Sequence, residues 1–332
     1  MKKFTLGMVA GAMTALSATT AFAEGHGEIT VAYFLEWPMP MMAAKASGAY
    51  DEALGMKVNW VSFETGVAMS AAMASGDVQI ALSQVLPPFV VAASGGQDLQ
   101  LVDVAVSYAE NQGCAVHKDL EIDKASAGEL AGKKVAVPLG TAAHYSFIRQ
   151  MDHFGVPLDS LSIVDMPPPE GANALAQKAV DFACGYGGGW ARMQEVGDVL
   201  LNGAEKKEIG ILVFDVTSVP AAFAAESGDT LAKFLKVTAD ANTEWNTNPS
   251  EEMLAVIAEQ AGMDVEAARS AISTMSFPSI DEQLSGAWLG GTAAPFMKGV
   301  ADVFVEAGSI DSALDSYEGA LNTAPLEAAK GM

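Results

Sequence analysis

The chain has few of the residues from which metal and redox centres are built, with two cysteines and four histidines among 332 residues. Cys114 and Cys184 are too far apart for a Cys-x-x-Cys motif, which excludes zinc and dithiol sites of that kind. A disulfide and two buried free thiols stay open as alternatives for this pair. We therefore expect no metal site and no cofactor.

Signatures of common enzyme classes are also missing. The chain contains no Gly-x-Ser-x-Gly, no His-Glu-x-x-His and no Gly-x-Gly-x-x-Gly. These patterns mark hydrolase elbows, zinc proteases and dinucleotide sites. A secreted enzyme is therefore only a remote alternative, and we expect a protein that is not an enzyme.

Positive charge is scarce, with 18 Lys and Arg against 41 Asp and Glu and a formal net charge of −23. Such an acidic surface repels nucleic acid and anionic lipid, so neither is expected as a partner. There are only three arginines, Arg149, Arg192 and Arg269, which argues against a purely anionic ligand held by guanidinium groups. Half of the residues are apolar and 18% are charged, which indicates a globular chain.

Beyond its first residues the chain has no apolar run that approaches the ~20 residues needed to span a bilayer. Lys2 and Lys3 precede an apolar stretch to Leu16, and Ala21-Phe22-Ala23 fits a small-x-small cleavage site. Residues 1–23 are therefore predicted to be a secretory signal peptide, with no cysteine after it for lipid attachment. We expect a soluble protein exported to a bacterial periplasm.

Strands and helices alternate through the first two thirds of the chain. Apolar runs predict strands over 29–34, 57–63, 78–82, near 135, 161–164 and 182–186. Helices are predicted over 43–50 and 68–74, and after residue 230 over 230–246, 250–261, 265–273, 281–289 and 296–307. Because the rhythm restarts at Cys114, we expect an α/β protein with two similar lobes, each a doubly wound parallel sheet flanked by helices.

Two segments carry candidate ligand chemistry. In Val135–Tyr145 a buried strand leads through Gly140 to Thr141, a good N-cap, so the first helical turn offers free amides to an oxyanion. His144 and Tyr145 follow as further donors, although an ordinary capped turn is the simpler interpretation. The second segment, Gly185–Trp190, is predicted to be a glycine-rich loop that permits close ligand approach.

Several short segments, in this order, resemble the periplasmic solute-binding proteins of ABC importers, in particular the nitrate/sulfonate/taurine group. They are Phe63-Glu64-Thr65-Gly66, Ala74-Ser75-Gly76-Asp77-Val78-Gln79-Ile80, Gly132 to Pro138 leading into His144-Tyr145-Ser146, and Phe214-Asp215-Val216. The His-Tyr-Ser helix start and the Asp215 segment are most similar to taurine-binding proteins.

The resemblance implies a two-lobed type II periplasmic binding protein fold with a ligand cleft between the lobes. Lobe one would comprise residues 24–108 plus 213–332 and lobe two residues 109–212, with crossings near 107–111 and 210–214. A small ligand would close the cleft, and the closed form, a monomer, would dock on an ABC permease at the inner membrane.

The resemblance also implies roles for particular residues if the ligand is taurine or a related small aminosulfonate. The first-turn amides after Gly140 and Gly66, with Thr141, His144 and Tyr145, would bind the anion. Asp215 would bind the ammonium, with Glu36 as a second carboxylate. Aromatic walls and further polar contacts complete the set of candidates: Tyr33, Trp37, Tyr186, Trp190, Glu64, Gln84 and Asn111.

The sequence departs from the taurine pattern at Tyr33–Pro40, Ser83–Pro88 and Gly187–Trp190. These segments add aromatic and acidic groups, so a receptor for a cationic or quaternary amine is the alternative. The cysteine-rich motif of the related pyrimidine-synthase branch is absent.

Overall fold

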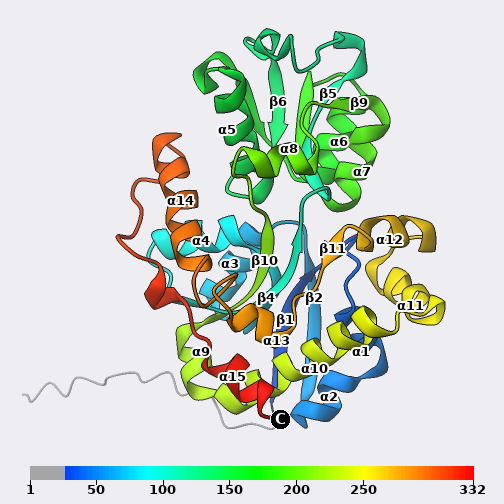
Figure 1. Cartoon of the computed structure of the whole chain (residues 1–332), viewed down its shortest axis with the longest axis vertical. Coiled ribbons are helices and arrows are strands. Elements are labelled where there is room, and N and C mark those ends of the chain that lie inside the picture. The colour runs from blue at the N-terminus through cyan, green and yellow to red at the C-terminus, as the bar shows by residue number, and fades with distance from the viewer. Residues whose placement is uncertain (1–26) are drawn as a thin grey trace, which may run out of the picture.

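Two sheets, each flanked by helices, form two lobes joined at a waist (Figure 1). The computed structural model describes residues 27–332, so the predicted signal peptide lies outside the described residues. We call the six-stranded sheet with its helices the first lobe and the five-stranded sheet with its helices the second lobe. The predicted α/β, two-lobed architecture is confirmed.

The first sheet has the strand order β11-β4-β10-β3-β1-β2. Its strands are β1 (Glu28–Phe34), β2 (Lys57–Phe63), β3 (Ile80–Val85), β4 (Leu99–Tyr108), β10 (Phe214–Pro220) and β11 (Met275–Ser276). β1 pairs in parallel with β2 and β3, as predicted, whereas β10 is antiparallel to β3 and β4. The sheet is mixed because β10 enters it from the second lobe, and so runs against the strands that lead there.

The second sheet has the order β7-β6-β8-β5-β9. Its strands are β5 (Gln112–His117), β6 (Lys134–Val137), β7 (Ser162–Asp165), β8 (Phe182–Tyr186) and β9 (Gly197–Val199). β6 is parallel to β7 and β8, and β5 is antiparallel to β8. Cys114 and Cys184 are paired residues of β5 and β8 and form a disulfide, which settles the alternative left open by the sequence.

Helices cover both faces of each sheet (Figure 1). Those of the first lobe are α1 (Met41–Ser47), α2 (Ala49–Leu54), α3 (Gly66–Ser75), α4 (Leu86–Ser94), α9 (Ala221–Glu226), α10 (Gly228–Thr247), α11 (Glu251–Ala261), α12 (Val265–Ile272), α13 (Ile280–Leu284), α14 (Ala293–Glu306), η4 (Glu318–Ala320) and α15 (Ala324–Lys330). Those of the second lobe are η1 (Lys118–Leu120), η2 (Ala127–Leu130), α5 (Ala142–Phe154), η3 (Leu158–Ser160), α6 (Pro168–Ala176), α7 (Gly187–Val196) and α8 (Gly203–Glu208).

The glycine run predicted as a loop is instead the junction of β8 with helix α7, which begins at Gly187. Glycine is a poor helix former, so the sequence favours a loop here. Close packing explains the run, because a Cβ on Gly189 would lie 2.7 Å from the backbone carbon of Pro168 in α6. The glycines therefore let α6 and α7 approach closely at the waist.

The chain crosses between the lobes twice, between β4 and β5 and again before β10. The two crossings lie side by side, since the amide of Tyr108 donates to the carbonyl of Val213 at 3.2 Å. The lobe boundaries drawn from the sequence remain a prediction.

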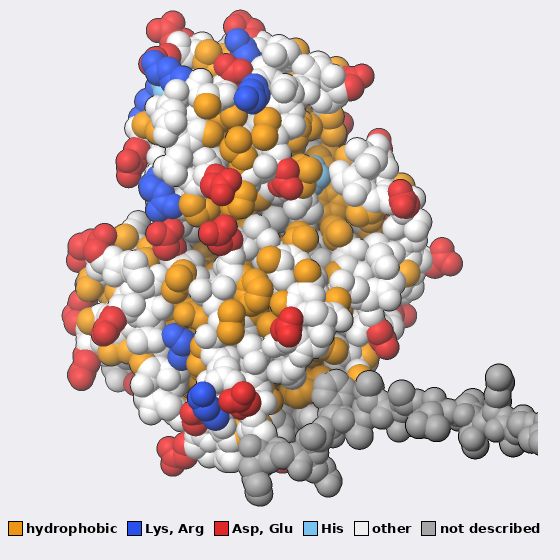
Figure 2. Space-filling view, turned by 180° about the vertical axis from the view of Figure 1, so that it is seen from behind, with side chains coloured by type: hydrophobic (Ala, Val, Ile, Leu, Met, Phe, Trp, Pro, Cys, Tyr) orange, Lys and Arg blue, Asp and Glu red, His pale blue; other side chains and the backbone are white. Residues whose placement is uncertain are grey.

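The surface of the described residues carries acidic side chains over both lobes, and apolar side chains gather where the lobes meet (Figure 2). Within residues 27–332 no helix is both long enough and apolar enough to cross a membrane.

Candidate ligand-binding site

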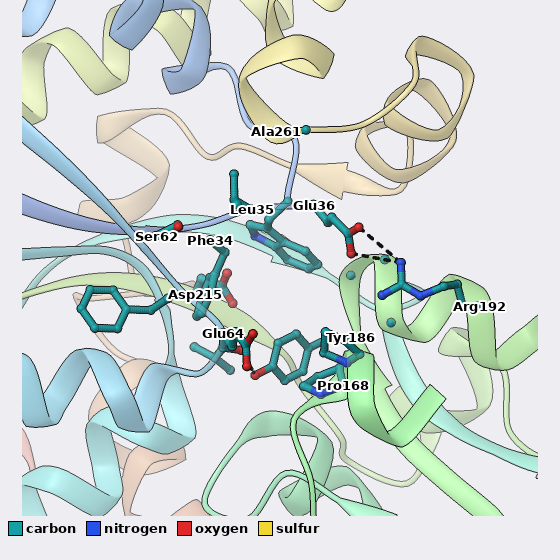
Figure 3. A pocket seen from close by; sticks show the side chains of 18 of the residues that line it. Phe34, Leu35, Glu36, Ser62, Glu64, Pro168, Tyr186, Arg192, Asp215 and Ala261 are labelled. Carbon is teal, nitrogen blue, oxygen red and sulfur yellow. Dashed lines mark hydrogen bonds and ion pairs between the residues drawn. The ribbon is translucent and has the colours of Figure 1, made fainter. Parts of the chain in front are cut away.

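A cavity of about 460 Å³ lies between the lobes (Figure 3). The first lobe contributes Phe34, Leu35, Glu36, Trp37, Ser62, Phe63, Glu64, Val85, Tyr108, Asp215, Ala261 and Gly262. The second lobe contributes Pro168, Pro169, Tyr186, Gly187, Gly188, Gly189 and Arg192. A cavity of this size is large enough for a small molecule, and its lining comes from both lobes.

Asp215, at the start of β10, is a fully buried carboxylate in the cavity wall (0% exposed). One carboxylate oxygen accepts a hydrogen bond from the Ser83 hydroxyl at 2.6 Å and the other accepts one from the Tyr108 hydroxyl at 2.8 Å. Within residues 27–332 no Lys, Arg or His side chain forms an ion pair with it. Asp215 is therefore a buried negative group with neutral partners only.

Burial raises the pKa of Asp215 from 3.8 to about 7, and the hydrogen bonds from Ser83 and Tyr108 offset part of this effect. A buried carboxylate without a counter-ion favours its neutral form, because desolvation disfavours the charge. Any cationic group that enters the cavity favours the ionised form instead.

Ser83, which donates to Asp215, has an unusual backbone conformation. Ser83 lies in β3 with a φ of 60°, the left-handed region that residues other than glycine seldom adopt. Such conformations persist where the surrounding structure holds them, and they are common at functional sites. Here the conformation accompanies the short hydrogen bond from Ser83 to Asp215.

Aromatic side chains surround this carboxylate. The Trp37 and Tyr108 rings meet edge to face with centroids 4.7 Å apart, and Phe34 lies 6.2 Å from Tyr186. The Tyr186 hydroxyl crosses from the second lobe and donates to the carbonyl of Glu64 at 2.9 Å. Trp37 is buried, and its indole N–H lies close enough to Asp215 to favour the charged form of that carboxyl, although no well-formed hydrogen bond joins them.

Opposite Asp215 the cavity ends at an ion pair between the lobes. Arg192 on α7 donates through Nη1 to the Glu36 carboxylate, 3.2 Å from Oε1 and 3.3 Å from Oε2 (Figure 3). Both side chains are partly exposed, 42% for Arg192 and 38% for Glu36. Arg192 is the one Lys or Arg among the lining residues.

Five of the twelve residues predicted from the sequence line the cavity: Glu36, Trp37, Glu64, Tyr186 and Asp215. They come from loops and strand ends of both lobes. Their contact with a ligand remains a prediction.

The structure does not bring Thr141, His144 and Tyr145 to this cavity. Thr141 caps α5 through its side chain, and His144 Nδ1 accepts a hydrogen bond from the Gly140 amide at 3.1 Å. The His144 ring stacks on Phe304 of α14, with centroids 5.2 Å apart, and burial lowers its pKa to about 4. The helix start is therefore packed against the first lobe, with a neutral histidine.

Three further predicted residues, all polar or aromatic, also lie away from the lining. The Tyr33 ring packs edge to face on Trp60, and the Gln84 amide donates to the Gly66 carbonyl and the Ser70 hydroxyl. Asn111 donates to the Ala271 carbonyl. These residues hold helices and strands together.

Trp190 differs most from its prediction as a ligand-facing aromatic residue. It is 4% exposed, its indole N–H donates to the Glu110 carbonyl at 2.8 Å, and its ring packs in the core of the second lobe. Because α7 is a helix, its fourth residue turns inward, whereas a loop would have left it in the cleft.

The sequence-based set omits Ser83 and Tyr108, which hold Asp215. Both stand in segments that the sequence did single out, the departing run Ser83–Pro88 and the crossing near 107–111. Arg192, which also lines the cavity and lies outside that set, stands three residues after the glycine run. A buried carboxylate needs hydrogen-bond donors, so hydroxyl groups on the neighbouring strands, here those of Ser83 and Tyr108, are the signal that could have identified these partners.

A family model for NMT1/THI5-like proteins matches residues 38–252, most of the described chain. The chain belongs to the NMT1/THI5-like family. It is also 27% identical to the taurine-binding periplasmic protein of Escherichia coli (strain K12) over 237 residues, which cover 71% of this chain and 72% of that protein.

Solved structures support the fold of this NMT1/THI5-like chain. The periplasmic aliphatic sulphonate binding protein of Escherichia coli matches with a TM-score of 0.68 and 19% identity, over 87% of this chain and 95% of that one. The periplasmic nitrate-binding protein of Synechocystis PCC 6803 matches with a TM-score of 0.70 and 17% identity, over 92% and 89%. The predicted periplasmic binding protein fold is therefore confirmed.

Metal coordination has no support in the described part of this NMT1/THI5-like chain. Residues 27–332 contain no group of three or more His, Cys, Asp or Glu side chains placed to hold an ion. The chemistry of the cavity is that of carboxylates, aromatic rings and one guanidinium.

Proposed function

We propose that this protein is the periplasmic substrate-binding component of an ABC importer, and that it binds taurine or a related small aminosulfonate between its lobes. The family membership and the taurine-binding relative of Escherichia coli support the class. The predicted signal peptide, outside the described residues, supports export to the periplasm. Both named structural relatives are periplasmic binding proteins, which supports a role other than catalysis.

One observation carries the proposal: Asp215 is a buried carboxylate that lacks a counter-ion and faces the cavity between the lobes. Leaving a buried charge unpaired is strongly unfavourable, so an ammonium group that pairs with it gains more than it would at the surface. The rings of Trp37, Tyr108 and Tyr186 add cation–π faces for the same group.

The other end of a zwitterion needs donors rather than carboxylates. Ser62 lies in the first-lobe wall, and Gly187–Gly189 at the start of α7 lie across the cavity, where a helix start offers backbone amides. A sulfonate accepts hydrogen bonds through three oxygens, so neutral donors around the ligand suit it. In this proposal the ammonium lies at Asp215 and the sulfonate toward the second lobe.

Contacts with both lobes link binding to closure. The proposed rigid bodies are residues 24–108 plus 213–332 and residues 109–212, as drawn from the sequence. A ligand held by Asp215 of one body and by groups of the other favours the closed arrangement through its differential contacts. The closed form, a monomer, would then dock on the permease.

A second candidate ligand is a cationic or quaternary amine. The cavity carries three carboxylates, Glu36, Glu64 and Asp215, against the single Arg192. An excess of negative charge beside aromatic rings is the environment that suits a ligand cation. This alternative differs from the first at both ends of the ligand: its ammonium need not carry an N–H, and its far end need not carry a sulfonate.

A thermal-shift panel separates the two. Taurine, hypotaurine, isethionate, choline and betaine are each titrated, because a bound ligand raises the melting temperature by mass action. The aminosulfonate proposal expects shifts for taurine and hypotaurine. Shifts for choline and betaine alone would exclude it and support the amine receptor. Chemical turnover of any probe would argue for an enzyme.

The matched variants are Asp215→Asn and Asp103→Asn. Asp103 on β4 is also a fully buried carboxylate, bonded to the Thr217 hydroxyl at 2.8 Å, but it lies outside the cavity lining. Asp215→Asn should lose the ligand shift and Asp103→Asn should keep it. Equal loss in both variants would contradict the proposed site.

A further inference from the structure

The Glu36–Arg192 pair spans the two lobes at the edge of the proposed ligand cavity (Figure 3). Glu36 stands in the loop after β1, and Arg192 stands on α7. A single guanidinium nitrogen contacts both carboxylate oxygens. The only Lys or Arg of the lining is therefore already paired with a residue of the protein.

The position of Glu36 is held by its surroundings. Its φ is 52°, in the left-handed region, and its amide donates to the Ala261 carbonyl at 2.8 Å. A residue other than glycine stays in this region only where neighbouring contacts fix it. The loop thus directs the Glu36 side chain across the cavity edge to α7.

Gly188 makes room for this carboxylate. A Cβ on Gly188 would lie 2.0 Å from Glu36 Oε2, so any larger residue displaces the carboxylate. The φ of Gly188 is not in the left-handed region, so alanine fits its backbone. A glycine is therefore required at position 188 to leave space for the Glu36 carboxylate.

We propose that Glu36 selects ligands by charge, because it keeps Arg192 paired and so withholds the cavity's one cation from the ligand. This inference rests on the proposed function and deepens it. With Glu36 and Arg192 neutralising each other, the charges left in the lining are the carboxylates Glu64 and Asp215. A ligand that has an anionic group but no ammonium meets only like charge, and is rejected.

Isethionate and taurine test the selection, because they share one skeleton and differ in hydroxyl against ammonium. The readout is the ratio of their affinities, measured by titration calorimetry at low salt. Glu36→Gln and Gly188→Ala should each shift this ratio toward isethionate by about tenfold, a change that 1.4 kcal/mol produces. In the double variant Glu36→Gln with Arg192→Gln, the shift of the affinity ratio toward isethionate should disappear.

Glu64→Gln is the matched control. It removes the same charge from the same cavity, but Glu64 has no ion pair with Arg192. If Glu64→Gln and Glu36→Gln shift the affinity ratio equally, the shift follows from the net charge of the cavity and not from the pairing of Glu36 with Arg192, and the proposal is wrong. An unchanged ratio in Glu36→Gln would also overturn it.

A measurement without ligand keeps the inference separate from the proposed function. Phenylglyoxal labels arginine, and the chain has only Arg149, Arg192 and Arg269, so mass spectrometry resolves each site. Labelling of Arg192, normalised to Arg149, should rise severalfold in Glu36→Gln and Gly188→Ala but not in Glu64→Gln. If no probe binds the wild-type protein, the proposed ligand class is wrong. If Arg192 labelling is unchanged in Glu36→Gln and Gly188→Ala, the proposed pairing of Glu36 with Arg192 is wrong.

Discussion

Replacing Asp215 by asparagine should stabilise the ligand-free protein above neutral pH. The carboxyl has a pKa of about 7 in the folded protein against an ordinary value of 3.8, because burial disfavours its charge. Its contribution to stability is therefore fully present below about pH 3.8 and is lost as the pH rises through about 7. Asparagine carries no charge and avoids this loss.

The size of the effect follows from the same values. The difference between about 7 and 3.8 corresponds to roughly 4 kcal/mol of destabilisation once Asp215 is fully ionised. The asparagine amide points a donor at one of two hydroxyls, from Ser83 and Tyr108, which costs about 1–2 kcal/mol. The net gain at pH 9 is about 2 kcal/mol, or a few degrees in melting temperature.

The assay is urea unfolding of wild type and Asp215→Asn between pH 5 and 9. The variant should be about as stable as wild type at pH 5, where the loss from ionisation and the cost of the amide nearly cancel, and more stable at pH 9. Asp103, whose burial raises its pKa to about 6, titrates in both proteins and cancels in the difference. A difference in unfolding free energy that stays constant from pH 5 to 9 would refute the reasoning, since Asp215 would then ionise without penalty.

Three further predictions concern residues outside the cavity lining. Replacing Cys114 and Cys184 by alanine should lower the unfolding free energy by about 2–4 kcal/mol, because the bond closes a long loop with a separation of 70 residues; an unchanged urea midpoint would count against the disulfide. His144→Ala should lower the melting temperature, because the contact with Phe304 is lost, but should keep ligand affinity. Loss of affinity with an unchanged melting temperature would indicate that the ligand binds at the start of α5. Trp190→Ala should cost about 3–5 kcal/mol on denaturation, since its side chain is buried, and little change there would contradict its core position.

Periodicity and local chemistry sufficed to predict most of the elements and the two-lobed fold. The predicted strands over 57–63 and 182–186 match β2 and β8. β8 is buried along its whole length, whereas β2 is an edge strand in which only Val58 is buried. The long helix α10 begins within two residues of its predicted start. Antiparallel β10 was not predicted, since strand direction depends on where the chain re-enters the sheet rather than on its residues.

Side-chain direction was the harder part of the site. Asp215 was predicted from the resemblance to taurine-binding proteins, and Glu36 and Tyr186 were predicted as a further carboxylate and an aromatic wall; all three line the cavity. Trp190 was misplaced because three glycines indicate a loop, and only the packing of α7 on α6 makes them helical. His144 has the right chemistry for a ligand but is used by its own helix cap and by α14.

In the proposed function, the distribution of charge between the lobes gives one small ligand a way to control closure. Asp215 and both of its hydrogen-bond donors belong to the first sheet, so the proposed ammonium site exists before the lobes move. The groups opposite, Tyr186 and Arg192, belong to the second lobe and already reach Glu64 and Glu36 across the waist. On this proposal, pairing of the ligand's ammonium with Asp215 supplies affinity in the first lobe, and the contacts across the waist couple that binding to closure. Removing the Asp215 charge should reduce binding of every ammonium ligand. Removing the Glu36–Arg192 contact across the waist should instead change which ligand is preferred.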